Sequence, residues 1–84
     1  EEITTVQRRK MTVRMRIREI WHRISEAKGQ LTFENLFDDA GNRTEVVITF
    51  LALLELLRMQ KVRVRQKHAF GSIDIISLVE SDGR

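Results

Sequence analysis

The side chains of this 84-residue chain that could do chemistry are two histidines, His22 and His68, and the adjacent carboxylates Asp38 and Asp39. Adjacent carboxylates could form a general acid–base pair, but at a helix end they usually serve a turn or face solvent. Neither histidine has a cysteine, a histidine or a carboxylate at the sequence spacing that is typical of zinc ligands. The chain has no cysteine, and its four glycines form no phosphate-binding loop. The sequence therefore predicts a protein that is not an enzyme and that uses no metal or cofactor.

Two helices and a short helical turn are expected in the first sixty residues. Apolar residues recur at spacings of three and four between Thr12, a plausible N-cap, and Lys28. Thr32 is the expected cap of a short helix that ends before Asp38. A long helix then starts near Thr44, or two residues earlier at an alternative cap, and ends near Gln60.

Two strands are expected after the long helix. Residues 61–66, KVRVRQ, alternate strictly between apolar and basic side chains, and residues 70–78, FGSIDIISL, alternate more loosely. With Gly71 as a turn residue, the two segments predict a β-hairpin. The expected fold class is α+β, specifically a winged-helix domain of long helix, short helix, long helix and two-stranded wing. We assign residues 1–11 to a lead-in from an upstream linker, 12–80 to the domain, and 81–84 to a disordered tail.

The long helix, VVITFLALLELLRM at residues 46–59, is apolar on more than one side. The larger apolar side is the expected core face. It contains Val47, Phe50, Leu51, Leu54 and Leu57, with Val46 and Leu53 at its edge. A second stripe contains Ile48, Ala52, Leu56 and Met59. This second stripe is either covered by the first helix or free to dock another protein.

The charge pattern allows weak binding to a polyanion. The net charge is +3 and the isoelectric point is about 10.0. Arg14, Arg18, Arg63 and Lys67 are the candidates for weak phosphate contacts. The first turns of the long helix offer Thr44, Glu45 and Thr49 rather than the basic or amide side chains that read base edges, which argues against sequence-specific DNA binding. The apolar run is too short to span a bilayer, so no membrane contact is expected.

The segment RTEVVITFLALLELLRMQKVRVRQ, residues 43–66, followed by FGSIDI, closely resembles the C-terminal domain of segregation and condensation protein A, the bacterial kleisin ScpA. LTFENLF, residues 31–37, and the first helix resemble the segments before it. The resemblance covers roughly residues 12–76. It implies a cytoplasmic, nucleoid-associated module of chromosome condensation and segregation that docks on the cap side of the ATPase head of an SMC protein. In that family an N-terminal domain holds the neck of the other SMC subunit, and the linker between the domains carries ScpB.

Two hypotheses about function therefore follow. The first is a non-catalytic kleisin domain that binds an SMC head. Its expected contacts are Leu53, Leu56, Met59 and Phe70, followed by Ile48 and Arg65. The second is the DNA-binding winged helix of a transcription regulator, with basic side chains on phosphates.

Overall fold

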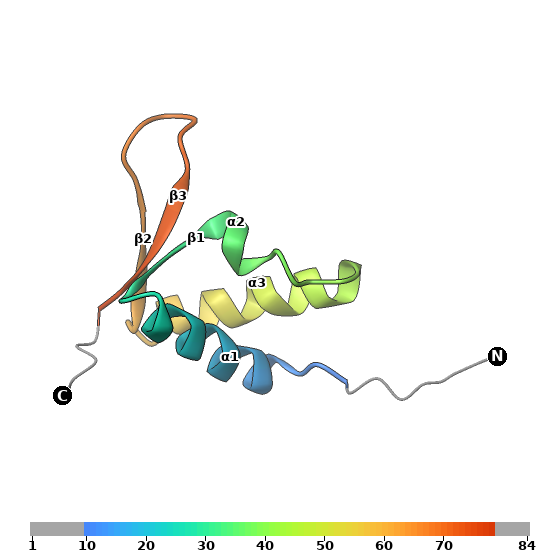
Figure 1. Cartoon of the computed structure of the whole chain (residues 1–84). Coiled ribbons are helices and arrows are strands. Elements are labelled where there is room, and N and C mark those ends of the chain that lie inside the picture. Colours follow the sequence, from blue (N-terminus) through green and yellow to red (C-terminus); the bar gives the residue numbers. More distant parts are fainter. Residues whose placement is uncertain (1–9, 79–84) are drawn as a thin grey trace.

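The structure, a computed structural model, describes residues 10–78 (Figure 1). The disordered tail predicted at 81–84 lies outside these residues, as does nearly all of the lead-in predicted at 1–11. Within them the element order is α1 (Val13–Glu26), β1 (Gln30–Thr32), α2 (Phe33–Leu36), α3 (Arg43–Arg58), β2 (Val62–Gln66) and β3 (Ile73–Ser77). The mixed α+β class is confirmed.

Each helix begins where a short polar side chain caps it. Thr12 Oγ1 accepts a hydrogen bond from the Met15 N–H at 3.1 Å, and Thr32 Oγ1 accepts one from the Asn35 N–H at 3.0 Å. At α3 the cap is Asn42, the earlier of the two predicted starts, whose Oδ1 accepts from the Glu45 N–H at 2.9 Å. These side chains satisfy amides that have no partner inside their helices, which explains why the predicted starts are confirmed.

The sheet contains one strand that the sequence analysis did not predict. β3 lies in the centre, with β2 antiparallel on one side and the three-residue β1 antiparallel on the other. Gly29 precedes β1 at φ +90°, and its carbonyl accepts a hydrogen bond from the Ser77 N–H at 2.8 Å. This left-handed backbone turns the chain from α1 directly into the sheet. A segment of three residues is too short to produce a recognisable alternation in the sequence.

The core lies between α1, α3 and one face of the sheet. In Figure 1, α1 lies along one side of α3 and reaches the foot of the sheet, whereas α2 and the upper part of the β2–β3 hairpin lie on the other side. The buried apolar residues come from all three helices and from the sheet. They are Ile20, Ile24, Leu36, Ala52, Leu53, Leu56, Val62 and Ile75.

The expected core face of α3 is wrong for most of its members. Val47, Phe50, Leu51 and Leu54 are each between 45% and 49% exposed. The stripe predicted as second contains the buried positions Ala52 and Leu56, because α1 covers it. Of the alternatives left open for that stripe, coverage by the first helix is therefore correct.

A buried arginine explains how the chain selects this face of α3. The Arg16 side chain is 1% exposed, and its Nε donates a hydrogen bond to Thr49 Oγ1 at 2.8 Å. On a helical wheel, Arg16 lies among the arginines that flank the apolar stripe of the first helix, and Thr49 lies between the two apolar stripes of the long helix. In the folded domain Thr49 instead lies fully buried on the face that contacts α1, where its partner satisfies it.

Candidate functional site

The main candidate site is an exposed apolar strip on α3, formed by Val46, Val47, Phe50, Leu51 and Leu54, which we call the α3 stripe. These five side chains are between 41% and 49% exposed. They are consecutive neighbours on one side of a regular helix, and each keeps almost half of its surface in contact with solvent. Contiguous apolar surface of this kind is uncommon on small monomers and typically marks a protein contact.

An apolar groove continues the α3 stripe toward α2. It has a volume of about 510 Å³ and is lined by Phe33, Phe37, Val46, Val47 and Phe50. The rings of Phe33 and Phe37 lie 4.8 Å apart between centroids and are tilted by 41°. The groove has only hydrocarbon walls, so a ligand would bind there by burying apolar surface rather than through hydrogen bonds.

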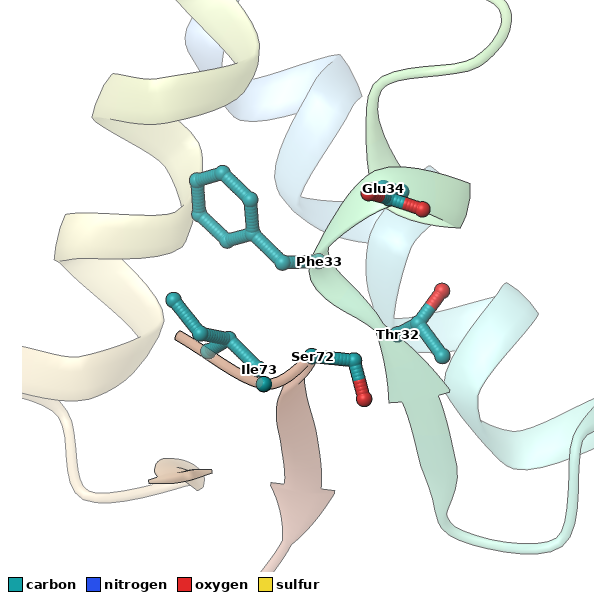
Figure 2. A pocket seen from close by; sticks show the side chains of 6 residues that line it. Thr32, Phe33, Glu34, Ser72 and Ile73 are labelled. Atoms are coloured by element: carbon teal, nitrogen blue, oxygen red, sulfur yellow. The ribbon is translucent and has the colours of Figure 1, made fainter. Parts of the chain in front are cut away.

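Phe33 connects this groove to the base of the hairpin. It also lines a smaller hollow of about 110 Å³ together with Thr32, Glu34 and residues 71–73. Figure 2 shows the side chains of Phe33 and Ile73 pointing to the side where α3 lies, whereas those of Thr32 and Ser72 point away. The apolar surface therefore runs from α3 across Phe33 to the start of β3.

The hairpin tip presents a second candidate, Phe70, whose side chain is fully exposed. Its φ of +66° is unusual for a bulky residue and costs of order 1–3 kcal/mol. Two hydrogen bonds hold the loop, from the Gly71 N–H to the His68 carbonyl at 2.9 Å and from Gln66 Nε2 to the Gly71 carbonyl at 3.0 Å. A solvent-exposed aromatic side chain kept on a strained backbone is typical of a binding residue.

The partner contacts expected from the sequence are divided among three places. Leu53 and Leu56 are buried in the core of the domain, so in this fold neither side chain is accessible to a partner. Ile48 is half-buried, and Met59 is 38% exposed at the end of α3. Met59 is nine residues from Phe50, or two and a half helical turns, so it faces away from the α3 stripe. Arg65 and Phe70 are on the hairpin, where Arg65 pairs with Asp74 at 3.6 Å.

The α3 stripe and its groove were missed as a site because the same residues were assigned to the core. One signal in the sequence could have identified them. Thr49 and Ala52 are small side chains on one side of the helix, and small residues allow a neighbouring helix to approach closely. The larger side chains Phe50, Leu51 and Leu54 are on the other side, where each stays about half exposed.

An ion-pair network holds the wall of the groove in place. The Arg16 guanidinium donates to Asp39 Oδ1 at 2.6 Å and to Glu19 Oε1 at 2.9 Å. Arg23 donates to the Asn35 carbonyl at 2.6 Å and pairs with Asp38 at 3.3 Å. Asp38 and Asp39, for which the sequence favoured a turn or a solvent-facing role, therefore fasten the segment between α2 and α3 to α1. The hydrogen bond from Arg16 lowers the pKa of the Asp39 carboxyl below its usual range.

Replacing this carboxylate should cost stability in a pH-dependent way. Because the folded pKa of Asp39 is depressed, its contribution is present above the unfolded pKa of about 4 and is lost as the pH falls through the folded value. We expect Asp39→Asn to lower the free energy of unfolding by about 1 kcal/mol at pH 7, a modest cost because the carboxylate is half-exposed. Urea unfolding at pH 7, 5 and 3 measures this cost, which should shrink toward pH 3.

Glu34→Gln is the matched control, since Glu34 is an exposed carboxylate without an ion-pair partner in residues 10–78. It should leave stability unchanged at every pH. A pH-independent cost of Asp39→Asn would contradict the role of its charge.

His22 has a neighbour that the sequence analysis overlooked. Its Nε2 lies 3.1 Å from Glu26 Oε2, one helical turn further along α1, and both side chains are exposed. Two such groups do not make a metal site, and no cluster of three metal-binding side chains occurs in residues 10–78. In the same part of the chain, no helix is long and apolar enough to cross a bilayer.

Comparison with known proteins identifies a family and several relatives of this chain. Residues 1–78 match the family described as segregation and condensation protein ScpA. The proteins named segregation and condensation protein A from Brevibacillus brevis and from Lactococcus lactis subsp. cremoris are 37% and 38% identical, over 89% and 87% of this chain. The protein of the same name from Bacillus cereus is 32% identical over 93% of it. The chain spans only 29%, 30% and 31% of the lengths of these three curated relatives.

Proposed function

Because the chain belongs to the family of segregation and condensation protein A, we propose that its domain is a non-catalytic docking module that binds the ATPase head of an SMC protein. The proposal places it in the cytoplasm on the nucleoid, in chromosome condensation and segregation. ScpB, the other partner that the resemblance implies, is expected to bind a linker of the full-length protein rather than this domain.

The observation that carries the proposal is the apolar surface that the domain leaves outside its own core. The α3 stripe and the apolar groove expose five large side chains of one helix together with Phe33 and Phe37. Keeping this surface in water is unfavourable by roughly 25 cal/mol for each Å². A partner of matching shape that covers it gains this free energy on binding.

The arrangement of the elements also supports the finer description of the fold as a winged helix. A helix, a short strand, two further helices and a hairpin follow one another, and β1 pairs with β3. In such a domain α3 is the recognition helix and the β2–β3 hairpin is the wing. We propose that Phe70 and Arg65 add a contact from the wing to the one made by α3.

The apolar surface of α3 argues against the alternative function, a transcription regulator that reads DNA bases with this helix. The side of α3 that would enter a major groove carries Val47, Phe50, Leu51 and Leu54. These side chains have no donors or acceptors for base edges. We therefore retain the docking function.

Direct binding tests the proposal. Titration of the 84-residue chain into a purified SMC head domain by calorimetry should give a saturable one-to-one complex. The two should also co-elute in size-exclusion chromatography, and the SMC hinge domain serves as the control. If the head gives no more binding than the hinge, head docking is excluded for this domain.

A further inference from the structure

The carboxylates of the domain are almost all engaged internally, and this leaves its free surface charge basic. Of the acidic residues in 10–78, all but Glu34 pair with a basic side chain or, at Glu45, with the backbone N–H of Gly41. The basic side chains without a carboxylate partner in that part of the chain are more numerous. They are Lys10, Arg14, Arg18, Lys28, Arg43, Lys61, Arg63 and Lys67.

Three of these cations share one surface, which we call the basic face of α1. Arg14 and Arg18 are exposed and one helical turn apart. Trp21 follows one turn later, and Lys61 Nζ lies 5.7 Å from the centre of its ring. Of the acidic residues on the same helix, Glu19 pairs with the buried Arg16, and Glu26 lies two turns beyond Arg18, beside His22.

We propose that the basic face of α1, formed by Arg14, Arg18 and Lys61, binds the phosphate backbone of duplex DNA. The charge of the face is complementary to a duplex, which carries one negative charge for about every 1.7 Å of its axis. Arg14 and Arg18 are separated by about 6 Å along the helix, a length over which a duplex presents several phosphates. Contacts to phosphates alone carry no sequence information, so the binding is non-specific.

The partner is a duplex rather than a single strand. Proteins that bind single strands stack the bases on exposed aromatic rings. On this face the one aromatic side chain within residues 10–78 is Trp21, which is half-buried and has Lys61 over its ring. The ring therefore anchors a cation and offers no free stacking surface.

The basic face and the α3 stripe belong to different sides of the domain. α1 packs against the side of α3 that contains Ala52 and Leu56, whereas the stripe is exposed elsewhere on α3. DNA binding by this face consequently goes beyond head docking and does not depend on it.

A salt titration with matched variants tests this proposal. Fluorescence anisotropy of a labelled DNA duplex, between 50 and 200 mM salt, should give a Kd of roughly 10⁻⁴ to 10⁻⁶ M near physiological salt. Each lost phosphate contact flattens the plot of log affinity against log salt by about 0.9. Arg14→Gln combined with Arg18→Gln should therefore reduce the slope by about 1.8 and leave the thermal melt unchanged, since both side chains are exposed.

The control is Arg43→Gln combined with Arg58→Gln, which removes the same charge from two exposed positions at the start and end of α3, outside the basic face of α1. It should leave the slope unchanged. An equal reduction by both pairs of substitutions would show that only the net charge matters and would overturn the proposal. Binding to vesicles that contain phosphatidylserine, without binding to the duplex, would also overturn it, because the ligand would then be a membrane surface.

Discussion

Leu56→Ala is expected to lower the free energy of unfolding by about 2–5 kcal/mol, whereas Leu54→Ala on the same helix should cost less than about 1 kcal/mol. Leu56 is completely buried between α1 and the sheet, so truncation leaves a cavity in a closely packed core. Leu54 is 45% exposed, and water fills the space that its truncation leaves. Both variants remove the same atoms from a leucine of α3, and they differ only in the side of the helix from which the atoms are removed.

Urea unfolding followed by circular dichroism measures both costs. A domain of this length has a total stability of roughly 4–12 kcal/mol, so Leu56→Ala should unfold at a visibly lower urea concentration.

A larger side chain at Ala52 provides a second check on the buried side of α3, because it would clash with the packed core and should also destabilise the domain. If Leu54→Ala proved as costly as Leu56→Ala, α3 would be turned the other way in solution, and the α3 stripe would not be a surface.

The elements were predictable because local signals define them. Thr12, Thr32 and Asn42 are N-cap residues at the correct places, and their side chains accept hydrogen bonds from amides in the first turns of the helices. The alternation of Val62, Arg63 and Val64 is enough to identify β2. β1 was not predictable from periodicity, since three residues contain less than two periods of alternation.

The orientation of α3 was not predictable from hydrophobicity, because both of its sides are apolar. Interactions with residues far along the chain decide between them. Thr49 is buried because Arg16, 33 residues earlier, fills the space beside it and hydrogen-bonds to it. Burying either the threonine or the arginine alone would leave a polar group without a hydrogen-bond partner, which is unfavourable. Buried together, the two side chains form a hydrogen bond with each other.

The candidate site was correspondingly harder to predict than the fold. Its expected members on the hairpin, Arg65 and Phe70, remain predictions, and Phe70 is fully exposed. The groove depends on Phe33 and Phe37, which approach Val46, Val47 and Phe50 only in the folded domain. Nothing in the local sequence around Phe33 indicates that a groove between α2 and α3 lies beside it.

Phe50→Asp is expected to weaken binding to the SMC head at least thirtyfold while leaving the domain folded. The aromatic ring lies in the α3 stripe and also lines the groove, so it belongs to both parts of the proposed docking surface. Truncating a central aromatic contact typically costs about 2 kcal/mol or more. Aspartate adds a further cost, because its charge would be desolvated against an apolar partner. Calorimetry with the head measures the loss, and a thermal melt of the free domain checks that it folds.

Met59→Asp is the matched control, because it makes the same kind of change at the C-cap of the same helix, on the side opposite Phe50. Met59 is 38% exposed and was expected from the sequence to contact the head. If the α3 stripe is the docking surface, this variant should bind the head within a few-fold of the unmodified chain. The reverse result, with lost binding for Met59→Asp and full binding for Phe50→Asp, would move the contact to the other side of α3. It would then be centred on the exposed parts of Ile48 and Met59, because Leu53 and Leu56 are inside the core.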